Sequence, residues 1–258
     1  MFWGIPTLIE NNSIDESIYL CKELGFNFVE LNMNLPQYQL ENIDIEKLNR
    51  LKEENNIFYT IHLDENLNVS DFNSYVANAY LKTVLDTIEI AKKLDIKILN
   101  MHLSKGVYFT LPDKKVYLFE QYRENYLQSI TSFRNTIEKK LKNTDIKICI
   151  ENTNGYTDFQ IEAIDILLQS SVFALTFDIG HSHCVDNIDE KFIINRENNL
   201  IHLHLHDAQD KNDHMTLGTG NVNIEKYIEL AKNHNCTVVL ETKTVEALKK
   251  SVEWLKNN

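Results

Sequence analysis

The chain is poor in the residues that interrupt or cross-link a fold. It has seven glycines and three prolines among 258 residues, and no low-complexity stretch separates one part from another. The four cysteines are scattered without CxxC spacing, which predicts reduced thiols rather than a disulfide framework. We therefore expect one domain over residues 1–258, large enough to bury a core without cross-links.

Positive charge and long apolar runs are also scarce. Lys and Arg number 26 against 38 Asp and Glu, which gives a net charge of −12, and only four residues are arginine. Nucleic acids and anionic membranes need a basic surface, so we expect neither as a partner, although a local basic patch stays open. No apolar run approaches the ~18 residues of a membrane span. The first residues, MFWGIP, lack the basic and apolar segments of a signal peptide, so we expect a cytoplasmic protein.

Short β-rich runs alternate with amphipathic segments along the whole chain. Eight runs are dense in Val, Ile, Leu and Phe: residues 2–6, 26–32, 57–62, 98–102, 146–151, 173–178, 200–206 and 237–241. Such density is typical of parallel strands that are covered on both faces. Helical patterns follow the runs at residues 13–25, 43–54, 71–94, 116–141, 158–168, 188–195, 224–232 and 245–255.

Eight strands and eight helices in strict alternation imply a parallel sheet with right-handed crossovers. Eight repeats of roughly 32 residues predict an α/β fold with a single (β/α)8 barrel. The alternative is a doubly wound open sheet, which would usually carry a glycine-rich phosphate turn after its first strand. No such turn follows residue 6.

Histidines and carboxylates gather at the ends of the predicted strands, which is where a (β/α)8 barrel places its active site. The residues at or just after these ends are His62, His102, Glu151, Asp178, His181, His204, His206 and Glu241, with His214 in the loop after residues 200–206. Side chains alternate across a strand, so His202, His204 and His206 should all point into the barrel. The same alternation directs inward the pairs Thr60/His62, Asn100/His102, Cys149/Glu151, Thr176/Asp178 and Val239/Glu241.

Three carboxylates in one barrel mouth would repel one another, and desolvation would raise their pKa values. No Lys or Arg lies within these strand ends to neutralise them. A bound divalent cation resolves the conflict, and His-rich ligation favours zinc, manganese, iron or cobalt over magnesium. We interpret His202, the deepest of its strand, as a core residue. His183 and His206 stay ambiguous, because His206 could also orient a metal ligand.

Two loops carry weaker signals. The segment Gly218–Asn221 could cradle an anion through its backbone amides at the start of a helix, although a tight turn capped by Asn221 or Asn223 explains it equally well. The loop over residues 104–115, which contains Tyr108 and Phe109, is long enough to act as a lid.

In their order and spacing these segments resemble the xylose isomerase-like TIM barrels. This superfamily unites sugar isomerases and epimerases with the family 2 apurinic endonucleases of the endonuclease IV type. The matching segments are Thr60-Ile61-His62, Asn100-Met101-His102, Ile150-Glu151-Asn152-Thr153, Phe177-Asp178-Ile179-Gly180-His181, His204-Leu205-His206-Asp207, Asp213-His214, Leu217-Gly218-Thr219-Gly220 and Leu240-Glu241-Thr242. The resemblance spans nearly the whole chain.

In the isomerase and epimerase branch, the resemblance implies a divalent metal, with zinc or manganese expected first and iron, cobalt or magnesium as alternatives. Its ligands would be Glu151, Asp178, His204 and Glu241. Glu151 and Glu241 would also be the catalytic residues, shuttling protons through a cis-enediolate of a sugar or sugar phosphate. Substrate would be bound by His62, His181 and His206. The plausible additional liners are Trp3, Glu30, Asn32 and Lys211.

In the endonuclease branch, the resemblance implies a zinc phosphodiesterase with a di- or trinuclear site. The further ligands would be His62, His102, His181 and His214. The family also has an Asp two residues before the last histidine, where this chain has Asn212, and Asp213 follows one residue late. That departure and the −12 charge favour the sugar branch. The sequence leaves the oligomeric state open, a homo-oligomer included.

Overall fold

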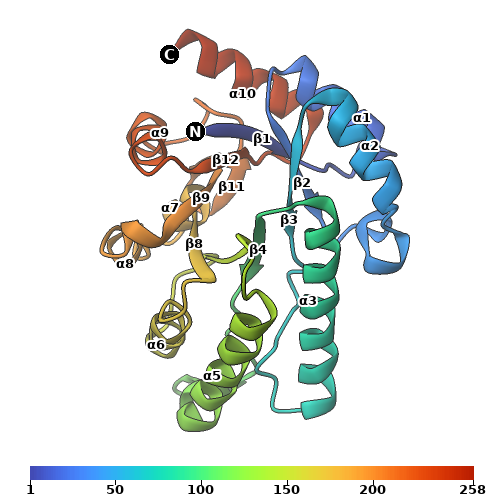
Figure 1. Ribbon diagram of the computed structural model, residues 1–258. Coiled ribbons are helices and arrows are strands. Elements are labelled where there is room, and N and C mark those ends of the chain that lie inside the picture. Colours follow the sequence, from blue (N-terminus) through green and yellow to red (C-terminus); the bar gives the residue numbers. More distant parts are fainter.

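The computed structural model describes residues 1–258. Eight parallel strands close into a barrel, and the main helices lie around its outside (Figure 1). The strands are β1 (Phe2–Pro6), β2 (Phe28–Asn32), β3 (Phe58–His62), β4 (Ile98–His102), β7 (Lys147–Glu151), β8 (Phe173–Asp178), β9 (Leu200–Leu205) and β12 (Thr237–Leu240). The closed order is β1-β12-β9-β8-β7-β4-β3-β2, so the (β/α)8 prediction is confirmed.

The α-helices are α1 (Ile14–Glu23), α2 (Ile45–Asn55), α3 (Ser74–Leu94), α4 (Leu118–Gln121), α5 (Arg123–Lys140), α6 (Asp158–Leu167), α7 (Ile179–His183), α8 (Glu190–Ile194), α9 (Ile224–Asn233) and α10 (Val245–Asn257). Several begin at side-chain caps that the sequence shows. Ser13 accepts a hydrogen bond from the backbone of Glu16, and Thr157 forms a capping box with Gln160. None of these helices combines the length and the apolar character that a membrane-spanning segment requires.

Two hairpins stand outside the barrel pattern. β5 (Tyr108–Thr110) pairs with β6 (Lys115–Tyr117), and β10 (Asp207–Gln209) pairs with β11 (Asn212–Met215). The prediction of a helix from residue 116 was therefore wrong at its start, because residues 115–117 pair with the preceding strand. The short helix α7 directly after β8 was also missed, since five residues are too few to show a period.

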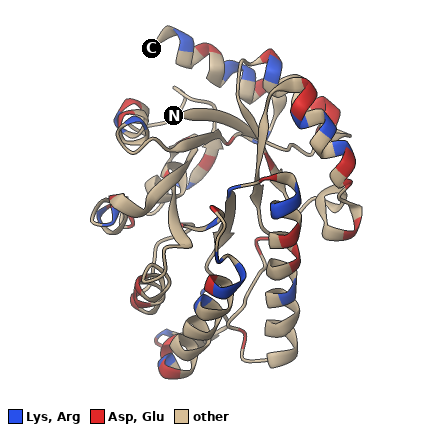
Figure 2. Cartoon of the chain, in the orientation of Figure 1, with Lys and Arg blue, Asp and Glu red and all other residues tan.

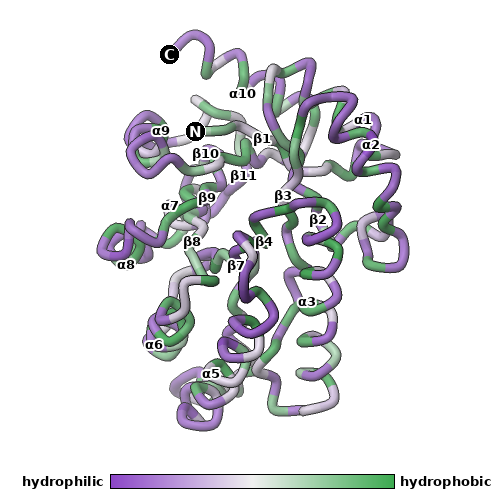
Figure 3. Tube along the Cα trace, in the orientation of Figure 1, coloured by the Kyte–Doolittle hydropathy of each residue, from purple (hydrophilic) through white to green (hydrophobic).

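The hydrophobic core lies mainly between the barrel and its helices. A single cluster of 57 buried apolar residues occupies this layer. Hydrophobic colour follows the strands and the inner sides of the helices, whereas the charged residues lie mostly on the helices (Figures 2 and 3). The helices therefore present most of the charged residues, whereas the strands contribute mainly apolar ones.

The barrel interior is plugged below the strand ends by aromatic rings. The ring of Phe28 stacks on Phe58 at 4.9 Å and lies 6.3 Å from the ring of His202. A methyl group at Gly4 would overlap the Phe28 ring, so glycine at this position makes room for it. Ile98, Cys149 and Ala174 form a small apolar cluster of their own. The polar side chains above are thus closed off from one end of the barrel.

Candidate metal centre at the carboxyl ends of the strands

Three carboxylates and one imidazole from four strand ends converge at the top of the barrel. Glu151, Asp178, His204 and Glu241 each offer one ligand atom, and these atoms all lie within 4.8 Å of one another. The register explains the meeting, because Asp178 of β8 pairs with His204 of β9 and both point inward. The backbone N–H of Glu241 donates to Leu205, which places the glutamate on the next strand beside His204.

Glu151 presents its two carboxylate oxygens to two different groups. Oε1 lies 3.2 Å from Nδ1 of His204. Oε2 lies 3.3 Å from Nε2 of His62 and 3.2 Å from Nε2 of His102, and it accepts a hydrogen bond from Asn100. Asn100 is itself held by Thr176, whose hydroxyl donates to Oδ1 over 2.6 Å. Glu151 therefore joins the four-residue group to a second pair of histidines.

His181 and His214 lie on the outer side of the same mouth. Nδ1 of His181 is 3.3 Å from Oδ2 of Asp178, and its Nε2 is 3.6 Å from Oδ2 of Asp213. Oδ1 of Asp213 is 4.0 Å from Nε2 of His214, and the His181 and His214 ring centroids are 5.2 Å apart. Asp213 thus faces both histidines, although it stands one residue later than the family pattern has its aspartate.

Both ring nitrogens of His206 form hydrogen bonds with other groups of the protein. Nδ1 accepts a 2.7 Å hydrogen bond from the backbone N–H of His214, so the proton sits on Nε2, which donates to Asp178 over 3.1 Å. The ring is fully buried, and a methyl group at Gly180 would overlap it. This arrangement favours the role of orienting Asp178 over direct substrate binding, which remains a prediction.

The glycine-rich loop before α9 already holds an anion, and that anion is Asp207. Its carboxylate accepts hydrogen bonds from the backbone N–H groups of Gly218, Gly220, Val222 and Ala208 at 2.8–3.1 Å. Of the two interpretations of Gly218–Asn221, the structure shows the tight turn: Asn223 caps α9, and an internal side chain rather than an external anion occupies the amides. The carboxylate instead ties this loop to the end of β9.

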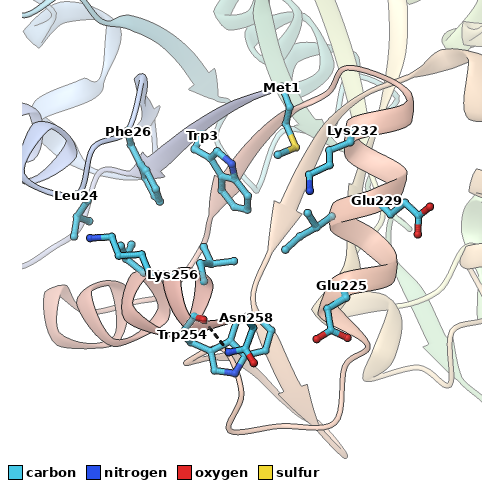
Figure 4. A pocket seen from close by; sticks show the side chains of 13 residues that line it. Met1, Trp3, Leu24, Phe26, Glu225, Glu229, Lys232, Trp254, Lys256 and Asn258 are labelled. Carbon is cyan, nitrogen blue, oxygen red and sulfur yellow. Dashed lines mark hydrogen bonds between the residues drawn. The ribbon is translucent and has the colours of Figure 1, made fainter.

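A large surface cavity, drawn from close by in Figure 4, shares none of its lining residues with the histidine cluster. It has a volume of about 570 Å³ and is lined by residues near the amino ends of the strands, among them Met1, Trp3 and Phe26, and by α9 and α10. Trp3 stacks on Phe26 there, with ring centroids 5.8 Å apart. Trp3 was expected as a liner of the active site, and that expectation was wrong. Its side chain points to the outside of β1.

The sequence model of the xylose isomerase-like TIM barrel family matches residues 18–258. The chain belongs to this family. An uncharacterized protein of Methanocaldococcus jannaschii, MJ1614, is 26% identical over 204 residues, which cover 77% of this chain and 76% of the relative.

Solved structures resemble this xylose isomerase-like barrel over its full length. A D-tagatose 3-epimerase-like protein superposes with a TM-score of 0.80 at 25% identity, covering 100% of this chain and 96% of that one. The 3-keto-D-glucoside 4-epimerase YcjR of E. coli gives 0.79 at 17% identity, covering all of both chains. The IolI protein, solved with a zinc atom, gives 0.74 at 14% identity, covering 100% and 96%. The latter two identities are low enough that these likenesses show the shared fold alone.

The donor set of this barrel fits a divalent metal ion. Three carboxylates and one imidazole are hard and borderline ligands of the kind that zinc, manganese, iron and cobalt accept. Oε2 of Glu241 is buried without a hydrogen-bond partner, although it lies only 2.9 Å from Nδ1 of His204. A buried carboxylate oxygen in this position calls for a positive centre beside it, which a metal ion or a protonated His204 can supply.

Protonated histidines balance the buried carboxylates when no metal is bound. Burial opposes the charged form of His62, but the carboxylates of Glu151 and Glu30 outweigh it and raise the pKa of His62 to about 9. Burial is likewise outweighed at His204, whose pKa lies well above its ordinary value because Glu151, Glu241 and Glu30 surround it. Metal binding must displace some of these protons, so it should become tighter as the pH rises.

This charge balance predicts how the stability of the metal-free xylose isomerase-like barrel depends on pH. The pKa of His62 is higher in the folded state than in the unfolded state, so its contribution is complete below pH ~6.5 and is lost as the pH rises through 9. We expect chelator-treated protein to lose about 3 kcal/mol of unfolding free energy over this window through His62 alone. Urea denaturation at both ends of the window measures the change, with His62→Asn as the control. A flat profile contradicts the prediction.

Proposed function

We propose that this protein is a divalent-metal-dependent isomerase or epimerase that acts on a sugar or sugar phosphate. The observation that carries the proposal is the convergence of Glu151, Asp178, His204 and Glu241 within 4.8 Å in a buried mouth. Similar solved structures also support the proposal, because proteins of the same fold include sugar epimerases. Zinc and manganese are the metals that we propose first, and the zinc atom in the IolI structure agrees with that choice.

In this proposal the two glutamates transfer protons at a sugar carbon next to a carbonyl group. The bound metal would polarise that carbonyl and so make the neighbouring C–H more acidic. Glu151 and Glu241 are both anionic, because cationic neighbours outweigh burial and hold the pKa of each carboxyl well below its ordinary value: His204 and His102 act on Glu151, and His204 and Lys243 act on Glu241. Each glutamate can therefore accept a proton, and His181 at the rim would donate a hydrogen bond to a substrate oxygen. Asp178 and His204 complete the binding of the metal.

A second function, a zinc phosphodiesterase, is supported by one specific observation. His62 and His102 approach Oε2 of Glu151, while Oε1 faces His204. A carboxylate whose two oxygens face different groups of ligands can bridge two metal ions. Two-metal sites stabilise both the attacking and the leaving oxygen of a phosphoryl displacement. His181, His214 and Asp213 offer a further group of donors. The net charge of −12 weighs against DNA as the substrate.

Metal content and isotope exchange test the proposal together. Protein purified without chelator is assayed for bound metal and is then incubated with a panel of ketohexoses and their phosphates in D₂O. We expect one metal ion per chain, and deuterium incorporation at a carbon next to the carbonyl of the true substrate, read by NMR.

The same preparation is offered an abasic DNA duplex in low salt with added zinc. Three zinc ions per chain and cleavage of the duplex would establish the phosphodiesterase instead. A protein that binds no metal would rule out both functions.

A further inference from the structure

Glu30 lies beneath the proposed metal centre and takes no part in it. Its side chain belongs to β2, is 1% exposed, and reaches across the barrel interior towards β9. The hydroxyl of Thr60, its partner in register on β3, donates a 2.8 Å hydrogen bond to Oε2. Nε2 of His202 lies 3.1 Å from the same oxygen. One oxygen of Glu30 is thus fixed by two neighbours.

The other oxygen of Glu30 faces His204. Oε1 lies 3.0 Å from Nε2 of His204, a close contact whose alignment falls short of hydrogen-bond geometry. The opposite nitrogen, Nδ1, faces Glu151 and Glu241 at 3.2 and 2.9 Å. His204 therefore has carboxylates next to both ring nitrogens, with Glu30 at Nε2 and with Glu151 and Glu241 at Nδ1.

His202 holds the other oxygen of Glu30 in place. Its Nδ1 contacts the hydroxyl of Thr237, the residue that pairs with it on β12, and its Nε2 points at Glu30. With Nδ1 engaged by Thr237, Nε2 is the ring nitrogen that donates to Glu30.

We propose that Glu30 is a positioning residue that keeps the proton of His204 on Nε2, so that Nδ1 is the nitrogen presented to the metal. The inference rests on the proposed function, since it assumes that a metal occupies the group above. When a metal replaces the proton on Nδ1, a single proton remains on the ring. The carboxylate 3.0 Å from Nε2 holds it there and prevents the alternative tautomer, in which Nδ1 would carry the proton and could not bind.

The charge of Glu30 also raises the basicity of His204 towards the metal. A carboxylate behind a ligating imidazole makes the ring a stronger donor, and loss of such a partner typically lowers metal affinity 10–100-fold. No lysine or arginine forms an ion pair with Glu30, so its charge is directed at the two histidines. Metal affinity should therefore depend on the charge of residue 30 as well as on its shape.

Cobalt binding to the full-length protein tests the role of Glu30. We expect Glu30→Gln, which keeps the size of the side chain, to lower Co²⁺ affinity 10–100-fold in competition with a chromophoric chelator. The visible absorption of bound Co²⁺ should change as well, because the donor strength of His204 changes. The matched control is Asp189→Asn, which neutralises another buried carboxylate, also 1% exposed, whose Oδ1 accepts from the backbone of Tyr156. This control should bind Co²⁺ like the wild type.

A second variant keeps the test decisive if Glu30→Gln folds poorly. Thr60→Val removes the hydroxyl that fixes Oε2 but leaves the charge, so we expect a smaller loss of affinity and a Co²⁺ spectrum close to that of the wild type. Wild-type affinity in both variants overturns the inference and leaves the proposed function standing. Failure of the wild-type protein to bind Co²⁺ overturns the proposed function and the inference together.

Discussion

Replacement of Glu241 by glutamine is expected to slow deuterium exchange at the substrate by about 10²–10⁴-fold, the usual contribution of a positioned acid or base. Glutamine keeps the size of the side chain and one oxygen, but it cannot take up a proton. The anionic state that makes Glu241 a competent base depends on its surroundings, because His204 and Lys243 outweigh burial and hold the pKa of its carboxyl well below the ordinary value. Nζ of Lys243 lies 3.0 Å from Oε1.

The control for this variant is Glu246→Gln on the same terminal segment. Glu246 is exposed at the start of α10 and pairs with Lys250 at 2.6 Å, far from any reacting group. Exchange should proceed at the wild-type rate in that variant. Metal content is measured in both proteins, so that loss of a proton-transfer group is separated from loss of a ligand. A fully active Glu241→Gln enzyme would exclude the mechanism with two glutamates.

Removal of the Asp207 carboxylate is expected to cause the largest loss of stability. Asp207→Ala strips four backbone N–H groups of their acceptor at once, and hydrogen bonds to a charged group contribute about 1.5–3 kcal/mol each. Because part of the loop can turn to water, we expect a net loss of about 4 kcal/mol. For a chain of this size that corresponds to a fall in Tm on the order of 10 °C.

Asp44→Ala serves as the reference for Asp207→Ala. Asp44 caps α2 and accepts a single backbone hydrogen bond, from Lys47 at 2.9 Å, so its loss should cost only about 1 kcal/mol. Thermal denaturation of the two variants side by side gives the ratio of their shifts in Tm. Equal shifts in Tm would mean that Asp207 does no more than cap one amide.

The barrel could be predicted from the sequence because one pattern, a short apolar run followed by an amphipathic segment, repeats along the chain. Each strand is a short run of apolar residues, and β1, β4 and β8 begin and end at the predicted residues. The two hairpins could not be predicted in the same way. β5 and β6 are three residues each and largely exposed, so no apolar run marks them, and their pairing depends on a turn rather than on burial.

The proposed metal ligands were visible because alternation along a strand fixes which side chains point inward. His204 and Asp178 could be placed in this way before any coordinates. Glu30 was seen only as a plausible liner, since its partners His202 and His204 lie across the barrel, at a sequence distance of more than 170 residues. Trp3 was misplaced because the first strand is short, and the pattern does not show which of its faces meets the helices.

The two oxygens of Glu151 face different groups of ligands, which would affect the affinities of a first and a second metal ion. A carboxylate that gives one oxygen to a first cation has less negative charge left for a second cation on the His62 and His102 side. The first ion would therefore bind tightly and the second more weakly, with two separate dissociation constants. The ambient concentration of free metal would then set how many ions each barrel holds.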